Sequence, residues 1–219
     1  MKNTIKLLYL SFALLFTSFF TLPLYAENET NSPGYTTHTF KFRDFAYTET
    51  IDNTLTIKYE SDTTKESYYL INQDGITQDV ISVDYSQPIS RAVNPNAHTA
   101  FFTRDKNIIG NGQNVVTVRI TVCVLYYSSG SFRSFEAVQY CNLTIPTSIT
   151  SMSLSNSSSS AWSHTGSFPC TQLDYAFTTT VTTNGSVSAG INAALVSAGF
   201  SNSTYSYRVV NGNGSISLY

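Results

Sequence analysis

The sequence predicts an all-β protein, an antiparallel β-sandwich of the immunoglobulin-like type with one short helix near residues 190–199. Three observations lead to this fold class. Short segments alternate between apolar and polar side chains, turns rich in Gly, Asn and Ser separate them, and strand-favouring Thr and Tyr are abundant. Only 12% of the residues are charged, so hydroxyl and amide groups must supply most of the polar surface.

The first 26 residues have the features of a secretory signal peptide. Lys2 and Lys6 make the start positive, an apolar run follows over 7–21, and Ala26 provides a small residue for cleavage. The run is shorter than the roughly 20 residues of a membrane-spanning helix, which favours cleavage over a retained anchor. We therefore expect a secreted, extracellular protein, with association with the cell wall as one form of this location.

Composition divides the remaining chain into three parts. Residues 27–33 are a polar leader, 34–110 a β-rich N-terminal region with most of the charge, and 111–219 a C-terminal β-sandwich region. The net charge of the whole chain is −2, which provides no electrostatic attraction to nucleic acid or anionic lipid. We therefore expect no nucleic-acid partner.

The N-terminal region contains four segments with strand patterns, and a turn signal, N-Q-D-G, precedes the last of them. These predicted strands lie at 37–44, 54–60, 66–72 and 79–85. In the second one, Leu55, Ile57 and Tyr59 share a face. Residues 86–114 are rich in Pro, Asn and Gly, and we interpret them as a crossing segment with one short strand near 100–104.

The clearest strand pattern is at 115–127, where every second residue from Val116 to Tyr126 is apolar. A turn at 128–131 leads to a second strand at 132–145. Pairing Tyr127 with Phe132 brings the apolar sets of both strands to one face. The Ser/Asn tract at 153–160 is then expected to act as a bridge to Trp162.

The last part of the chain supplies the remaining elements. A strand is predicted at 172–183, with Leu173, Tyr175, Phe177 and Val181 on one face. The spacing of Ile191, Ala194, Leu195 and Ala198 fits a short helix that stops at Gly199, although alternation fits almost as well and leaves a strand as the alternative. Two strands at 203–210 and 215–219 flank N-G-N-G, which we interpret as a hairpin turn.

Three cysteines in an exported chain allow one disulfide bond. In the predicted hairpin Cys123 and Cys141 lie on opposite faces, so we favour a Cys141–Cys170 bridge, which would add about 3 kcal/mol of stability if unstrained. The alternative is that all three are small apolar core residues. The chain has no C-x-x-C motif, and its histidines lack paired spacing with the cysteines, so we expect no metal site.

Motifs for chemistry are scarce. G-x-S-x-G, H-E-x-x-H and phosphate-binding glycine loops are absent, so we assign no catalytic residue and no cofactor. Trp162, His164 and Tyr127 are the candidate binding residues, because aromatic rings with a polar group can stack on sugars or peptides. The alternative is that His164 is a hydrogen-bonded loop residue and that each tyrosine simply fills the sheet.

Three stretches carry a resemblance: Y-Y-S-S-G-S-F-R, S-A-W-S-H-T-G-S-F and T-T-T-V-T-T-N-G-S. Here the C-terminal half resembles uncharacterised secreted β-sandwich proteins of Gram-positive bacteria. The resemblance implies export and the sandwich fold. It implies no activity and no site.

Three functions compete. The favoured one is a secreted or wall-associated, non-enzymatic binding protein whose partner is a cell-wall glycan or an extracellular protein. The second is a membrane-active protein, because 178–200 resembles the small, Ser/Thr-rich segments that pore-forming toxins insert into membranes. The third is a secreted hydrolase that uses His164, because the members of a catalytic triad need not be close in sequence.

Overall fold

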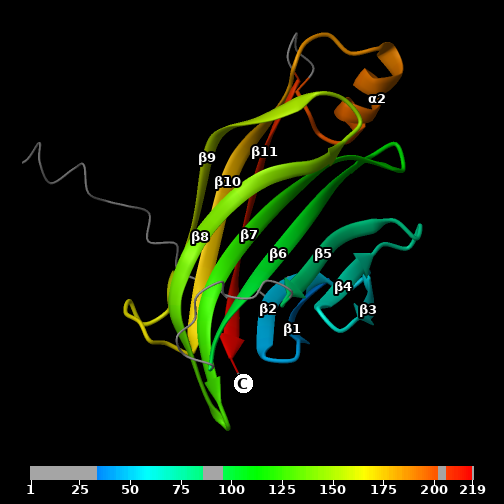
Figure 1. The fold of residues 1–219 in the computed structure, drawn as a ribbon. Helices are drawn as coiled ribbons and strands as arrows, with labels where there is room; N and C mark the ends of the chain where they lie inside the picture. Colours follow the sequence, from blue (N-terminus) through cyan, green and yellow to red (C-terminus); the bar gives the residue numbers. More distant parts are fainter. Residues whose placement is uncertain (1–33, 86–95, 202–205, 219) are drawn as a thin grey trace, which may run out of the picture. The chain divides into compact units, whose positions relative to one another are not determined.

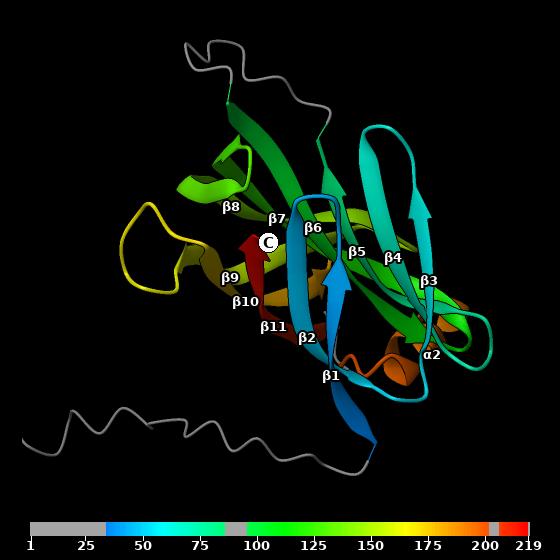
Figure 2. The ribbon, with the colours of Figure 1, turned by 90° about the horizontal axis from the view of Figure 1, so that it is seen from below.

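The computed structural model describes residues 34–85, 96–201 and 206–218. They belong to one compact unit, Pro33–Tyr219, and form eleven strands and one helix in two antiparallel sheets (Figures 1 and 2). The predicted all-β sandwich with one short helix is thereby confirmed. The predicted signal peptide at 1–26 and the polar leader at 27–33 lie outside the described residues. Within the described residues, no helix is long and apolar enough to cross a membrane.

The first sheet has five strands in the order β1-β2-β11-β10-β9. Its outer strands, β1 and β9, are far apart in the sequence, and the C-terminal strand β11 lies in the centre. The strands are β1 (Tyr35–Lys41), β2 (Phe45–Asp52), β11 (Tyr207–Leu218), β10 (Gln172–Thr183) and β9 (Met152–Ser163).

The second sheet has six strands that follow one another in the sequence, a more local connectivity than the Greek-key order of immunoglobulin domains. They are β3 (Thr56–Ser61), β4 (Lys65–Ile71), β5 (Thr77–Asp84), β6 (Ala97–Gly110), β7 (Gln113–Ser129) and β8 (Phe132–Ser148). The regions 34–110 and 111–219 each contribute strands to both sheets, and the boundary between them falls in the β6–β7 turn.

The core lies between the two sheets and is made by the alternating apolar sets of the strands. The ring of Phe102 in β6 lies 5.0 Å from that of Tyr47 in β2 and 5.9 Å from that of Tyr175 in β10. The alternation predicted for β7 and β10 is confirmed by burial of Val116, Val118, Ile120, Val122, Val124, Tyr126, Leu173, Tyr175, Phe177 and Val181. Ile57 and Tyr59, which alternate in the same way in the sequence, are exposed, and they lie in the edge strand β3.

The turns between β6 and β7 and between β7 and β8 are tighter than predicted from the sequence. Asn111 and Gly112, with φ of 49° and 73°, make a two-residue turn that extends β6 well beyond the predicted 100–104. Gly130, with φ 59°, opens a second two-residue turn, so Ser129 and not Tyr127 pairs with Phe132. Beside the turn the predicted register is therefore wrong by two residues, a shift that preserves the faces there, and irregularities further along β7 and β8 increase the difference.

The Ser/Asn tract is the strand β9 and not a bridging loop. It pairs with β10 from Met152 to Ser163, with one irregularity at Thr178 and Thr180. The Ser157 and Thr179 hydroxyls share a hydrogen bond of 2.6 Å. Backbone pairing with β10 thus outweighs the weak strand preference of serine and asparagine.

The N-G-N-G segment is also a correction, because it lies inside the single strand β11. A Cβ atom on Gly212 would lie 2.6 Å from the Phe177 ring, and one on Gly214 would lie 2.6 Å from the Tyr47 hydroxyl oxygen. Both glycines allow a large aromatic side chain to cross directly over the strand. Their role is close packing, and not the chain reversal that the sequence indicates.

The predicted helix is α2 (Ala189–Ser197), with Ala194 and Leu195 buried. Gly199, at φ 79°, follows its end. A Cβ atom on Gly110 would lie 2.0 Å from the Ala194 carbonyl oxygen. The helix therefore packs closely on the end of β6.

Candidate functional site

Trp162 and Asp174 lie side by side on the outer face of the five-stranded sheet. They are direct partners in the β9–β10 ladder, and paired residues share a face. The neighbours of Asp174 in β10, Leu173 and Tyr175, are buried, so Asp174 projects outward. Trp162 is 45% exposed, which leaves its ring available to a ligand.

His164 follows β9 and is held against the same face. Its backbone N–H donates to the Gln172 carbonyl oxygen at 3.0 Å, and its ring Nδ1 lies 2.7 Å from Asp174 Oδ2. The Gln172 amide nitrogen is 3.4 Å from both His164 Nδ1 and Asp174 Oδ1. Because the carboxylate accepts, the ring carries a proton on Nδ1 and leaves Nε2 for a ligand.

Small polar side chains continue the face around these residues. Ser215 and Ser217 of β11 are opposite Asp174 and Gln172, and Ser160 of β9 is the next outward residue before Trp162. The face thus offers one indole ring beside a row of hydrogen-bond donors and acceptors. Such a surface is chemically suited to bind a sugar, whose C–H faces stack on aromatic rings while its hydroxyls form hydrogen bonds.

The same geometry gives little support to nucleophilic catalysis. In the described part of the chain, the His164 ring donates from Nδ1 to Asp174, and no hydrogen bond goes through Nε2. A serine hydrolase needs a hydroxyl on the other ring nitrogen. The histidine side chain is also 57% exposed, whereas a catalytic base works best where water is excluded.

Tyr127 is not part of this arrangement. It lies in β7, with its ring 5.9 Å from that of Phe132, and its hydroxyl accepts a hydrogen bond from the Asn96 side chain. The neighbouring Tyr126 is buried between the sheets, so Tyr127 is on the outer face of the six-stranded sheet. The structure therefore brings Trp162 and His164 together and places Tyr127 on the other side of the sandwich.

The predicted Cys141–Cys170 disulfide is not formed, because all three cysteines are free thiols. Cys170 pairs with Phe135 at the start of β8, whereas Cys141 lies opposite Val122, six residues further along the same strand. At about 3.3 Å per residue, this separation is far too long for a bridge. Cys123 is 1% exposed although it is on the polar face, and its thiol donates to Gln139 Oε1.

Among the described residues, no group of three or more His, Cys, Asp or Glu side chains is arranged to hold a metal ion.

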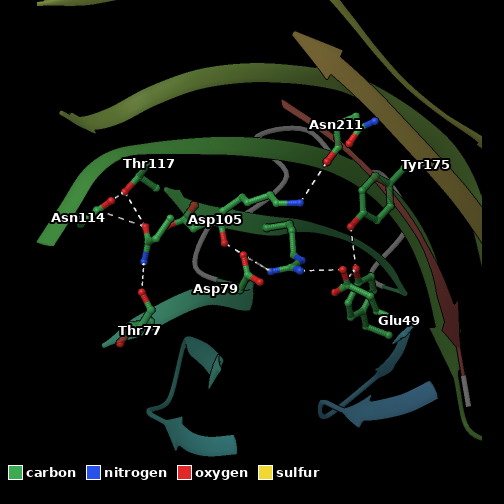
Figure 3. A network of polar contacts seen from close by, with 12 residues as sticks. Glu49, Thr77, Asp79, Asp105, Asn114, Thr117, Tyr175 and Asn211 are labelled. Carbon is green, nitrogen blue, oxygen red and sulfur yellow. Dashed lines mark hydrogen bonds and ion pairs between the residues drawn. The ribbon is translucent and has the colours of Figure 1, made fainter. Parts of the chain in front are cut away.

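A second polar cluster lies between the sheets (Figure 3). The Arg104 guanidinium lies 2.7 Å from the Glu49 carboxylate and 3.1 Å from that of Asp79. The Tyr47 hydroxyl donates to Glu49 at 3.0 Å and shares a 2.8 Å hydrogen bond with Tyr175. These contacts connect β2 and β10 of one sheet with β5 and β6 of the other.

Burial dominates the acid–base properties of this cluster. It raises the pKa of Tyr47 well above the usual value, and repulsion from Tyr175 adds to this effect. Burial also raises the pKa of Tyr175. For Arg104, burial alone would lower the pKa, but attraction to Asp79 above all outweighs it and keeps the guanidinium charged. The cluster is thus a fixed ionic contact between the sheets, and Arg104 is too deeply buried to meet a ligand.

Asp174, Gln172 and the Arg104 cluster were not among the site residues predicted from the sequence. The signal for Arg104 was the alternation in β6, where it occupies an inward position between Phe102 and Ile108. Asp174 was detectable as an outward residue of β10, but its position beside Trp162 depends on β9, whose serine-rich part was predicted to be a loop.

A scan against protein-family models found no match, and comparisons with curated proteins and with solved structures found none either.

Proposed function

We propose that this protein is a secreted or cell-wall-associated, non-enzymatic protein that binds glycan on the outer face of its five-stranded sheet. The observation that supports this most is the exposed Trp162 ring beside the hydrogen-bonded Asp174, His164 and Gln172. The ring would stack on one face of a sugar. The three polar side chains would then bind its hydroxyl groups.

The position of the site on the outer face of a sheet indicates the kind of glycan. An open sheet surface buries less of a ligand than a pocket does, so each sugar would be bound weakly. Weak contacts suffice where the ligand is a polymer, because once one sugar is bound, its covalently linked neighbours meet the rest of the face at a high effective concentration. A long cell-wall glycan therefore suits this site better than a free monosaccharide.

The membrane-active alternative has less support. A strand that faces lipid needs an apolar side chain at every second position, but residues 155–160 in β9 are polar on both faces. The apolar side chains of β10, such as Phe177 and Val181, are committed to the core. The next part of the 178–200 segment, Ala189–Ser197, is the helix α2.

The single tryptophan of the chain makes the proposal directly testable, because all indole fluorescence comes from Trp162. Titration with soluble oligosaccharides released from a bacterial cell wall should change this emission saturably. In pull-downs with intact walls, we expect Trp162→Ala to weaken retention about tenfold, a typical cost for a stacked aromatic ring. Phe132→Ala is the matched control, since Phe132 is an aromatic residue that is 61% exposed, against 45% for Trp162, and lies in the other sheet.

Three outcomes would contradict the proposal. The first is an unchanged Trp162 emission together with full retention of the Trp162→Ala variant. The second is retention that survives digestion of the glycan and disappears when wall proteins are stripped, which would indicate a protein partner. The third is release of dye from liposomes, which would support the membrane-active alternative.

Location is tested separately. If the signal peptide is cleaved as proposed, mass spectrometry of the protein recovered from the culture medium or the wall should find Glu27 at its N-terminus. A chain that keeps residues 1–26 would refute this part of the proposal.

A further inference from the structure

The central strand β11 has an open edge along most of its length. It pairs with β10 over Tyr207–Ser217, but on its other side it pairs with β2 only over Ser215–Leu218. Beyond this point β2 continues in its pairing with β1 and has no ladder with β11. The range 207–214 of β11 therefore has no strand partner on that side among the described residues.

The backbone groups at this edge can be assigned from the alternation of hydrogen bonds. Ser206 bonds to Thr183 at the end of β10, whereas the N–H and C=O of Tyr207 both bond to Ser201, away from β10. The Asn211 carbonyl accepts from Lys106. Odd-numbered residues of β11 thus present their backbone groups to the open edge.

Three successive odd residues, Val209, Asn211 and Asn213, therefore form a row of donors and acceptors. In the part of the chain that the structure describes, only the Asn211 carbonyl in this row has a partner, the Lys106 ammonium at 3.3 Å (Figure 3). A row of unpaired backbone groups is a template for another strand. Recognition by strand addition uses such a row for affinity and the alternate side chains for specificity.

The side chains around the edge indicate the chemistry of the added strand. On the inner side are two cations, Lys106 and Arg208, which bond to the backbone carbonyls of Asn211 and Ala198. Neither forms an ion pair among the described residues, and Asp79, the register partner of Lys106, binds Arg104 instead. On the outer side, Tyr207 and Val209 are 50% and 60% exposed.

We propose that the open edge of β11 binds an extended acidic peptide segment of a partner protein as an added β-strand. Its carboxylates would lie on the inner side beside Lys106 and Arg208, and its apolar residues on the outer side beside Tyr207 and Val209. This pattern corresponds to alternating acidic and β-branched residues. One lysine at an edge also protects it against unwanted pairing, but Lys106 occupies only one of the backbone groups.

The test uses the full processed chain and a blocked hexapeptide in which valine and glutamate alternate between terminal threonines. Isothermal titration should detect binding, and nitrogen-15 NMR should place the largest amide shifts at Val209, Asn211 and Asn213. The same peptide with lysine in place of glutamate should bind at least tenfold more weakly. Trp162→Ala should bind the acidic peptide as well as the wild type, because Trp162 lies two strands away, in β9.

Two variants probe the edge itself. Asn213→Pro removes an N–H that points away from β10, so the ladder with β10 is kept, while peptide affinity should fall at least tenfold. If this variant does not fold, Lys106→Met serves the same purpose and should weaken binding about fivefold, with Lys58→Met of the exposed strand β3 as the matched control.

The proposal is overturned by the absence of binding at millimolar peptide, by equal affinity for the basic peptide, or by amide shifts elsewhere in the chain. It is also overturned if sedimentation shows a dimer of the wild type that Asn213→Pro converts to a monomer. That result would identify a second copy of this chain as the occupant of the edge.

Discussion

Arg104 in β6 and Glu49 in β2 form an ion pair of 2.7 Å that joins the two sheets through the core. The Arg104 side chain is only 6% exposed. A buried charge is costly once its partner is removed. The contact therefore penalises any packing of the sheets that separates these two residues.

Replacing Arg104 by methionine should lower the free energy of unfolding by about 3 kcal/mol, because Glu49 and Asp79 would lose their counter-ion. Urea denaturation followed by circular dichroism measures this loss. Arg119→Met is the matched control: Arg119 binds Asp105 at the outer face of the sheet, and its loss should cost about 1 kcal/mol or less. Equal losses in the two variants would argue against a special role for the inter-sheet pair.

Gly214→Ala should destabilise the protein by about 2 kcal/mol, because the new methyl group would overlap the buried Tyr47 and Tyr175 side chains. Gly190→Ala is the opposite case. Gly190 is in the helix α2 with open space around its Cβ position, so this change should raise stability by up to about 1 kcal/mol. Thermal unfolding should show a lower melting temperature for Gly214→Ala and a higher one for Gly190→Ala. An unchanged melting temperature for Gly214→Ala would refute the close packing across β11.

Stability should fall steeply above about pH 10, the ordinary pKa of tyrosine. Burial raises the pKa of Tyr47 and Tyr175 in the folded state, so the unfolded chain loses these protons first. The two tyrosines contribute fully to the free energy of unfolding at a pH below their pKa in the unfolded chain. Above it this contribution falls as the pH rises, by about 1.4 kcal/mol per pH unit for each group. Absorbance at 295 nm should show both phenols ionising only with unfolding. Ionisation of all tyrosines near pH 10 in the native protein would contradict this.

Cysteine chemistry offers a fourth test. Without reductant, the denatured chain should expose three reactive thiols, because no disulfide is formed. In the native protein Cys141 should react first, since it is half-buried while Cys123 and Cys170 are buried. The reaction should be slow even there, because burial raises the pKa of both the Cys123 and the Cys141 thiol and the thiolate is the reactive form. A cross-linked peptide that contains Cys141 and Cys170 would contradict the structure.

The parts of the fold that follow from a two-residue period were predictable. The inward sets of β7 and β10 could be read directly, because every second side chain of a strand faces one side. The strand β9 could not, because serine and asparagine favour turns, and only pairing with β10 makes 153–160 a strand. N-G-N-G was wrongly predicted as a turn for a related reason, because the role of its glycines depends on tertiary packing. They leave room for the Phe177 and Tyr47 rings and do not reverse the chain.

Only those residues of the candidate site that are close to one another in the sequence could be predicted together. Trp162 and His164 are two residues apart, so their proximity needs no knowledge of the fold. Asp174 and Gln172 join them through the register of β9 on β10, which the sequence pattern leaves undefined. The expected bridge between Cys141 and Cys170 was wrong for the same reason, because the position of Cys170 along β8 is set by its pairing with Phe135.

The serine-rich edge strand β9 affects how readily the protein aggregates at high local concentration. Flat, apolar edge strands can pair with strands of neighbouring molecules and start the formation of amyloid. Over residues 155–160 this edge strand has small polar side chains on both faces and is distorted where Asn156 adopts φ 48°, so this part has no apolar side chains for a dry steric zipper. We therefore expect that this edge does not start fibril formation when molecules are concentrated.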